Sequence, residues 1–465
     1  MVTLTIYLIC ISNLFNIVAF FTISFQRNGD VLVSDVNNIT QNTGNALHDA
    51  KAGKNLQQLK EQNTLSILRL IRERGPVTRQ QLKIISGLSF TSCAAITKGL
   101  IEIGLVREIG QGSSLGGRKP LLLDLNQEFG FVIGMVISSS GITCGVFDLR
   151  MNERSIKKIN GDFSGEKIIT GICECAFDIL DTCALSPEYI VGMAIGVAGI
   201  VDTERYSIVV SAQLKFREIT NILSEVEDLL PFPVYLENNG NLMALAEKKL
   251  YYPEYSSLVY IIVDEGIGGG VIHNDEIMRG TLGYVGEFGH MSIERNGPLC
   301  FCGNKGCLEI LGSVSTLVQN ATFGLVSHRD SYIKKYIEND EVTMHSIIKA
   351  FHDGDKLATQ LFEEEADVLY HAVIKAITAN DPQVIILGGE IIQFGENLLK
   401  RIREKIENTI FGFELSERVI AFSSLPTHAE ICGAGMYAIE SFLENSIYKS
   451  ILSQDRIDAS SSNPV

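Results

Sequence analysis

The sequence contains two similar strand-turn-strand patterns that begin about 125 residues apart. The first pattern covers residues 131–137 and 142–147, and the second covers 258–263 and 268–272, where three consecutive glycines lead into Val-Ile. Helical patterns follow each of these openings, and alternating strands and helices are typical of α/β proteins. We therefore expect an internally duplicated α/β body with two lobes and a ligand site between them.

Charge is distributed unevenly along the 465 residues. The whole chain has a net charge of −16, but residues 51–120 contain twelve Lys and Arg against four Asp and Glu. A basic segment on an acidic body indicates that one end of the chain meets a polyanion such as DNA. The contents of 46% apolar and 20% charged residues exclude a disordered, collagen-like or coiled-coil protein.

The basic segment has the pattern of a winged helix-turn-helix, an α+β domain that we place at residues 56–125. Apolar residues recur at helical spacing up to Gly75-Pro76, where a helix must stop. Thr78 and Ser89 can cap two further helices. A Gly-rich loop at 110–117 then separates two strand patterns, which together would form the wing.

The third helix of this segment predicts which side chains would enter a major groove. If Cys93, Ile96, Leu100 and Ile103 face inward, the outward face carries Thr91, Ser92, Ala95 and Lys98. None of these is the Arg, Asn or Gln that makes bidentate base contacts, so DNA shape would contribute to discrimination. The wing would add Arg118, inserted into a narrow minor groove, and Lys119. A small helical domain that binds another protein would show the same helices.

Four metal-ligating side chains lie within eighteen residues: His290, Cys300, Cys302 and Cys307. Three thiolates and one imidazole match tetrahedral zinc ligation, and four protein ligands leave no position for a catalytic water. We therefore predict a structural zinc ion. A disulfide or unrelated buried thiols are the alternatives. The cysteine spacing favours a reducing, cytoplasmic compartment over a disulfide framework.

Residues 1–27 form a hydrophobic extension, and no charged residue occurs between residues 2 and 25. The stretch is long enough to cross a bilayer but lacks the basic leading region of a secretory signal. Three interpretations stay open: a membrane anchor, a buried or disordered extension, and upstream sequence translated from a misplaced start. We expect a linker at 28–55 and a disordered tail at 449–465.

Taken in order, the motifs of the chain resemble the ROK family of repressors, open reading frames and sugar kinases. The similarity extends over about residues 56–445 and is strongest to the transcription-regulator branch, typified by the xylose and N-acetylglucosamine repressors. The motifs that carry it are Gly116-Gly117-Arg118-Lys119-Pro120, residues 196–202 (GVAGIVD), residues 237–241 (ENNGN), residues 266–270 (GIGGG), the Glu287–His290 and cysteine segment, Asp381-Pro382 and residues 386–389 (ILGG).

The resemblance implies a two-lobed, actin-like (ribonuclease-H-like) sugar kinase fold. The first lobe would comprise 126–238 plus 430–448, and the second lobe 239–429 with the zinc loop. The family's sugar pocket falls on five residues of this chain, whose amides, carboxylates and imidazole suit sugar hydroxyls: Asn238, Asn239, Glu287, His290 and Glu309. His290 would hold zinc through one nitrogen and a hydroxyl through the other. Glu287 and Glu309 could instead be ordinary surface carboxylates.

Three departures from the kinase pattern argue against ATP-dependent phosphorylation. Asn239 stands where the family's kinases have the catalytic Asp, and an amide cannot accept a proton at neutral pH. The first phosphate loop, Asp-x-Gly-Gly-Thr, is replaced at 137–140 by Ile-Ser-Ser-Ser. The second has Asp264-Glu265 in place of Gly-Thr, and two carboxylates would repel a triphosphate. We therefore expect neither bound ATP nor enzyme activity.

Together these patterns predict a sugar-responsive transcriptional regulator, a repressor of carbohydrate-use genes. Its partners would be a double-stranded DNA operator, a sugar or sugar derivative as effector, and a second copy or three further copies of the chain in a homodimer or homotetramer. Three alternatives remain. The chain could be an active ROK-type sugar kinase with an appended DNA-binding module, a regulator tethered to the membrane through residues 2–25, or a co-regulator that binds a transport protein through its zinc-bearing lobe.

Overall fold

The computed structural model describes the backbone of residues 23–25, 31–33, 40–111, 119–138, 140–163, 167–203, 207–211, 214, 222–412, 418–425 and 429–461. Side chains are described from Gln57 to Asn445 within these ranges. The chain divides into two units, residues 1–66 and 67–465. Each unit is described by itself.

The first unit contains a short antiparallel strand pair and most of one long helix. Strand β1 (Ile23–Phe25) pairs with β2 (Val31–Val33), and α1 spans Thr40–Arg74. The expectation of a linker over 28–55 is therefore wrong from Thr40 onward. The segment lacks an apolar period, but it also lacks proline, and Ala, Lys, Gln and Leu have high intrinsic helix propensity. Of the hydrophobic extension at 1–27, only β1 lies among the described residues.

Helices α2 and α3 begin and end where the sequence predicts. Helix α2 (Arg79–Ser86) starts from a capping box in which the Thr78 side chain accepts from the Gln81 N–H, and it ends at Gly87 with φ +72°. Helix α3 (Phe90–Glu102) is capped by Ser89, which accepts from the Ser92 N–H. The strands form a three-stranded sheet rather than the expected two-stranded hairpin, since β3 pairs with β5; their order is β3 (Val77–Thr78), β5 (Leu121–Leu125), β4 (Val106–Gln111).

One prediction for the buried face of α3 is wrong. Cys93 and Leu100 are buried as expected, but Ile103 is 42% exposed and Thr97 is fully buried. Ile103 is the C-cap residue, so it no longer follows the helical face. Thr97 is tolerated in the core because its hydroxyl accepts from Arg79 Nε at 2.9 Å and donates to the Ala94 carbonyl at 3.2 Å.

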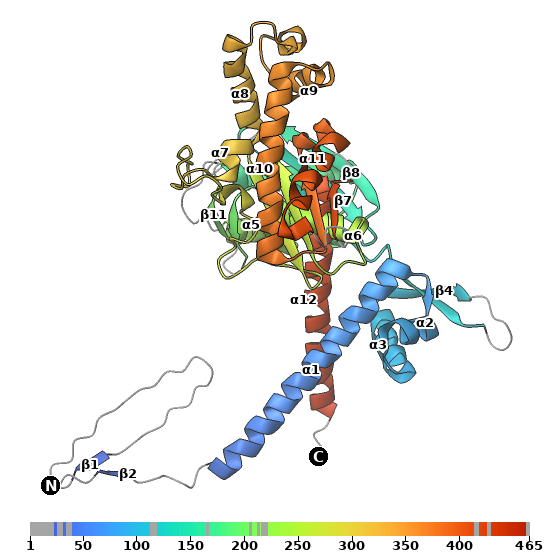
Figure 1. Ribbon diagram of the computed structural model, residues 1–465. Coiled ribbons are helices and arrows are strands. Elements are labelled where there is room, and N and C mark those ends of the chain that lie inside the picture. The colour runs from blue at the N-terminus through green and yellow to red at the C-terminus, as the bar shows by residue number, and fades with distance from the viewer. Residues whose placement is uncertain are drawn as a thin grey trace. The chain divides into compact units, whose positions relative to one another are not determined.

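The body contains two five-stranded sheets that have the same topology. Figure 1 labels β7 and β8 of the first sheet. In each sheet the first strand pairs antiparallel with the second, the second antiparallel with the third, and the first parallel with the fourth. The fifth strand extends the parallel side of each sheet. The first sheet has the order β12-β9-β6-β7-β8 and the second the order β15-β14-β13-β16-β17. The predicted internal duplication is confirmed.

The strand bounds are β6 (Phe131–Ser138), β7 (Gly141–Asp148), β8 (Glu153–Asn160), β9 (Ile190–Val197) and β12 (Val234–Asn238) in the first sheet. They are β13 (Leu258–Val263), β14 (Ile267–His273), β15 (Glu276–Ile277), β16 (Val384–Gly388) and β17 (Val419–Phe422) in the second. A separate hairpin joins β10 (Ile200–Asp202) to β11 (Ser207–Val210).

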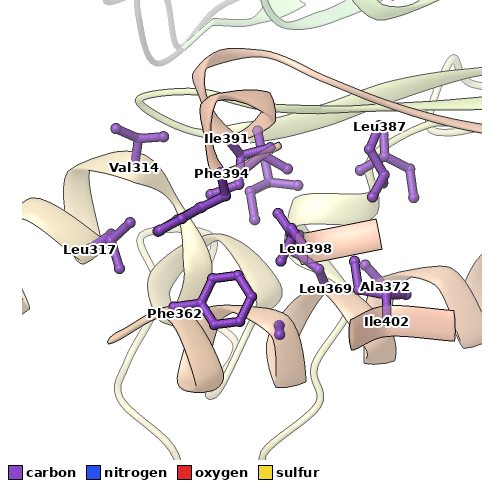
Figure 2. Packing of buried hydrophobic residues seen from close by; sticks show 14 of the residues in the cluster. Val314, Leu317, Phe362, Leu369, Ala372, Leu387, Ile391, Phe394, Leu398 and Ile402 are labelled. Carbon is purple, nitrogen blue, oxygen red and sulfur yellow. The ribbon is translucent and has the colours of Figure 1, made fainter. Parts of the chain in front are cut away.

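Helices cover the faces of both sheets and enclose two large apolar cores. The first core packs β6, β7 and β9 against α4 (Lys167–Cys183) and α5 (Ile222–Leu229). The second core packs the β13–β16 sheet against helices such as α10 (Lys356–Asn380). In this core the rings of Phe362 and Phe394 meet edge-to-face, with their centres 5.3 Å apart (Figure 2). The remaining helices are α6 (Asn239–Leu250), α7 (Leu308–Gly312), α8 (Val314–Ser327), α9 (Met344–His352), α11 (Glu396–Glu407) and α12 (Ala429–Ser461).

Helix α12 returns the end of the chain to the first sheet, where Ile431 and Gly435 pack against Gly134. The helix continues to Ser461, so the expectation of a disordered tail over 449–465 is wrong for the described residues. Neither glycine nor proline interrupts the sequence between Gly435 and Pro464, and nothing there stops the helix.

Among the described residues, no single helix is long and apolar enough to cross a membrane; the bent pair α2 and α3 passes that test only jointly.

Candidate functional site

Four ligand side chains converge beside the second sheet. The ligand atoms of His290, Cys300, Cys302 and Cys307 all lie within 4.8 Å of one another. The Sγ atoms of Cys302 and Cys307 are 3.6 Å apart, and Cys300 Sγ is 3.8 Å from His290 Nδ1. A tetrahedral ion with metal–sulfur bonds of about 2.3 Å has edges of about 3.8 Å, so the spacing fits a bound metal. The cluster can hold a metal ion.

Glycine allows the cysteine loop to fold this tightly. Gly306 precedes Cys307 with φ +62°, and a Cβ there would lie 1.9 Å from the Glu294 carbonyl oxygen. Only a residue without a side chain fits this turn. Cys300 and Cys307 are buried, whereas Cys302 is exposed at the tip of the loop.

His290 connects this cluster to the predicted sugar-binding carboxylates. Its Nδ1 faces Cys300, and its Nε2 lies 3.9 Å from Glu287 Oε2. Burial raises the pKa of Glu287, and the carboxylate of Glu309 raises it further, while His290 lowers it. The two nitrogens of the ring therefore face two different functional groups, a thiol and a carboxylate.

Glu309 is held at the glycine-rich start of β14. Its Oε2 accepts a hydrogen bond of 3.0 Å from the Ile267 N–H. A Cβ on Gly266 would lie 2.7 Å from the same carboxylate oxygen, so the carboxylate is packed against the backbone of this turn. The Glu309 carboxylate is thus held in place by the backbone of this turn.

Gly269 of β14 brings the two halves of the predicted sugar site together. A Cβ on Gly240, in the first turn of α6, would lie 2.1 Å from the Gly269 carbonyl oxygen. A Cβ on Gly286, which has φ +97°, would lie 2.5 Å from the same oxygen. The segments that carry Asn239 and Glu287 therefore both pack against the backbone of Gly269.

Asn238 and Asn239 occupy the start of α6. Asn238 is its N-cap: Oδ1 accepts from the Gly240 N–H at 2.7 Å, and Nδ2 donates to the Gly199 carbonyl at 2.6 Å. The Asn239 Oδ1 is buried and has no hydrogen-bond partner within the described part of the chain. A Cβ on Gly196 would lie 2.5 Å from this oxygen. The Asn239 amide thus faces the backbone of Gly196, near the end of β9.

Carboxylates gather where the second phosphate loop would be. Asp264 Oδ1 accepts a 2.6 Å hydrogen bond from the Glu390 N–H, at the turn after β16. Burial raises the pKa values of Asp264, Glu390 and Glu430. Repulsion from Asp264 adds to the increase for Glu390 and Glu430, and repulsion from Glu265 adds to it for Asp264 and Glu390. The backbone N–H that could bind a phosphate here is therefore occupied by the carboxylate of Asp264, and the surroundings are acidic.

Three of the predicted DNA-contacting residues lie on the exposed face of α3. Thr91, Ser92 and Lys98 are exposed, although Lys98 Nζ lies 3.6 Å from Glu102 Oε1. Lys119 is exposed just before β5, and Arg118 lies outside the described residues. Helices α2 and α3 are joined by three residues and meet at a bend of 119°, an angle within the range that helix-turn-helix motifs have.

A profile of the ROK family matches residues 132–441, about two thirds of the chain. A xylose repressor from Caldicellulosiruptor bescii is 30% identical over 394 residues, which cover 83% of this chain and 97% of the repressor. The chain belongs to the ROK family. The family match includes both sheets, the metal cluster and the predicted sugar-site residues.

Two solved structures of ROK proteins have the same fold. A ROK transcriptional regulator, a homologue of the Escherichia coli MLC protein, aligns with a TM-score of 0.75 at 23% identity over 85% of this chain and 99% of that chain. A ROK glucokinase from Streptomyces griseus, solved with glucose and AMPPNP, aligns with a TM-score of 0.59 at 26% identity over 67% of this chain and 100% of the kinase. The body is therefore a kinase-like α/β fold, and the regulator alignment extends into the residues before it.

The sequence did not indicate an ion pair beside the site. Glu237 is 1% exposed; its Oε1 accepts from the Asn238 N–H and Asn241 Nδ2, and its Oε2 accepts from Arg279 Nε at 2.7 Å. Glu237 belongs to the first sheet and Arg279 to the segment after β15, so the pair joins the two lobes. No local pattern in the sequence connects residues 42 positions apart.

Proposed function

We propose that the chain is a sugar-responsive DNA-binding transcriptional regulator that acts as a repressor. The observation that carries this proposal is that one chain combines two helices joined by three residues at a 119° bend, a cluster that can hold a metal ion beside Glu287, and an acidic group at the predicted nucleotide loop. The xylose repressor that resembles the chain over 97% of the repressor's own length supports the same function.

The DNA reader is a winged helix-turn-helix in which α3 enters the major groove and the β4–β5 loop forms the wing. The support is the 119° bend between α2 and α3, the exposure of Thr91, Ser92 and Lys98, and the three-stranded sheet behind them. The predicted wing residues are Arg118 and Lys119. A homodimer or homotetramer would present paired modules to a two-fold operator.

The effector is a sugar or sugar derivative bound by Asn238, Asn239, Glu287, His290 and Glu309. Zinc bound by His290, Cys300, Cys302 and Cys307 would fix the orientation and tautomer of the His290 ring, so that Nε2 could meet a hydroxyl. The support is the position of His290 between Cys300 and Glu287. Sugar binding would shift the closure of the lobes through its differential affinity for the two states.

Kinase activity is not part of the proposal. Asn239 provides no base, and the Glu390 N–H is already bound by Asp264. The similarity to the glucokinase keeps the alternative of a sugar kinase with a DNA-binding module testable. Release of ADP with any sugar of a panel, abolished by Asn239→Ala, would favour the enzyme.

The test is a gel-shift assay with genomic fragments at low salt, with and without xylose, glucose and N-acetylglucosamine. We expect tight binding to at least one fragment and a change in its Kd with one of the sugars. Thr91→Glu places a negative charge on the exposed face of α3 and should abolish binding, whereas Thr322→Glu, on the exposed face of α8, is the matched control. Absence of DNA binding at low salt contradicts the proposal.

A further inference from the structure

Glu440 of α12 forms ion pairs with cations from two other helices. Its Oε2 lies 2.9 Å from Arg69 Nε, and its Oε1 lies 2.9 Å from Arg72 Nη1 and 3.4 Å from Lys249 Nζ. The Glu440 side chain is only 12% exposed. Burial alone would raise its pKa, but Lys249, Arg72 and Arg69 together lower it. Arg69 and Arg72 lie in the last two turns of α1, within the residues 56–125 that we place in the DNA-binding module.

Helix α6 connects the sugar site to this ion-pair cluster. Asn238 caps its first turn, and Lys249 lies in its last turn. The twelve residues of the helix span about 18 Å, and residues 240–248 are all buried. A buried helix packed on all sides moves as a rigid element. A displacement at Asn238 would therefore reach Lys249.

A second route runs through the ion pair between the lobes. Glu237 accepts from Arg279, and the Arg279 guanidinium lies 5.5 Å from the centre of the Tyr437 ring. Tyr437 precedes Glu440 by three residues on α12, so both side chains lie on the same face of that helix. A change in the relative position of the lobes would therefore move a neighbour of Glu440.

We propose that Glu440 is the residue through which sugar binding weakens the ion pairs that attach the DNA-binding module to α12. This inference rests on the proposed function. The Oε1 atom is shared between Lys249 and Arg72, so a closer approach of Lys249 weakens the bond to Arg72. Closure of the lobes around a sugar moves α6 and Arg279, draws Glu440 toward Lys249 and loosens the module. Without sugar, the longer Lys249 contact leaves Glu440 bound to both arginines.

The test uses two variants of the full chain that change the cluster in opposite directions. Glu440→Gln keeps the shape but removes the charge; we expect its Kd for the selected DNA fragment, without sugar, to match that of the sugar-bound wild type. Lys249→Met removes the competitor of Arg72; we expect tight DNA binding that sugar no longer weakens. In both variants the ratio of Kd values with and without sugar falls at least fivefold relative to wild type.

Glu363→Gln removes an ion pair with Arg401 on the second lobe and is the matched control, with an unchanged ratio. Sugar binding, followed separately by calorimetry with the sugar active on the wild type, stays intact in all variants. If Glu440→Gln does not fold, the Kd ratio of Lys249→Met tests the proposal by itself. A responsive wild type with equally responsive variants contradicts this inference alone. A wild type that binds DNA but responds to no sugar contradicts the proposed function as well.

Discussion

The Nε2 atom of His290 lies 3.9 Å from Oε2 of Glu287, while the other ring nitrogen faces the cysteine cluster. One imidazole thus joins the metal-type site and the sugar-type site. Because a ring bound to metal through Nδ1 carries its proton on Nε2, the metal determines which hydrogen bonds the ring can make toward Glu287. Loss of the metal should therefore affect sugar binding as well as local stability.

Cys307→Ser is expected to remove the metal. We predict about one zinc ion per wild-type chain and almost none in the variant, measured by elemental analysis. The variant should also lose the increase in melting temperature that the active sugar gives the wild type. Cys173→Ser, at a half-buried cysteine of α4 far from the cluster in sequence, should keep both the metal and the sugar response. If the metal-free Cys307→Ser variant binds sugar like the wild type, sugar binding does not depend on the metal.

Asn239→Ala should weaken sugar binding with little effect on the stability of the unliganded protein. The Oδ1 atom has no partner within the described residues, so its removal breaks no internal hydrogen bond. The loss of one or two bonds to a sugar corresponds to about 1–3 kcal/mol, or about five- to 150-fold in Kd. Calorimetric titration measures it, with Asn408→Ala at the end of α11 as the control. Unchanged affinity would place the sugar elsewhere.

The double variant Asp264→Gly, Glu265→Thr restores the kinase residues of the second phosphate loop. It removes two carboxylates and frees the Glu390 N–H, so affinity for a Mg²⁺–ATP analogue should rise. The wild type should show no thermal stabilisation by the same analogue. No phosphorylated sugar should form with either protein, because Asn239 cannot act as the base. Nucleotide binding by the wild type would overturn the explanation based on repulsion.

Glu365 of α10 should make stability depend on pH. It is 3% exposed, its Oε1 has no partner among the described residues, and burial raises its pKa well above the usual value. The folded state therefore binds this proton more tightly than the unfolded state. The free energy of unfolding thus falls as the pH rises from about 4.3, the unfolded value, to the folded-state pKa.

Glu365→Gln should remove that decrease and leave the protein more stable than wild type near neutral pH. Chemical denaturation between about pH 4.5 and pH 7.5 measures the difference between the two curves. Glu364→Gln, at the exposed neighbouring position, should follow the wild-type curve. Parallel curves for wild type and Glu365→Gln would show that folding does not raise the pKa of this carboxyl.

Lys119→Gln should weaken binding to all DNA sequences by a similar factor. A phosphate contact carries no sequence information, and its loss reduces the slope of log K against log salt by about one. Fluorescence anisotropy over a series of salt concentrations measures both effects. Lys405→Gln is the control: it breaks an ion pair between Lys405 on α11 and Asp367 on α10, and it should leave the slope unchanged. An unchanged slope for Lys119→Gln would exclude Lys119 from the interface.

The sequence by itself determined the duplicated α/β body, the ends of α2 and α3, and the four side chains that could hold a metal ion. These features depend on local signals: capping residues such as Thr78 and Ser89, the period of apolar residues, and the spacing of Cys300, Cys302 and Cys307. The predictions of a linker at 28–55 and a disordered tail at 449–465 were wrong where the structure describes α1 and α12, because polar helical segments carry no apolar period. The prediction that Ile103 faces inward was also wrong, because Ile103 lies just beyond the last turn of α3.

Only the tertiary structure decided which distant groups meet. The Arg279–Glu237 pair joins the two lobes, Glu440 contacts Arg69, Arg72 and Lys249, and Oε1 of Glu365 is buried with no partner among the described residues. A charged residue has the same one-dimensional pattern whether it faces water or another charge. Its partner is determined by how helices and sheets pack, which depends on contacts between segments hundreds of residues apart.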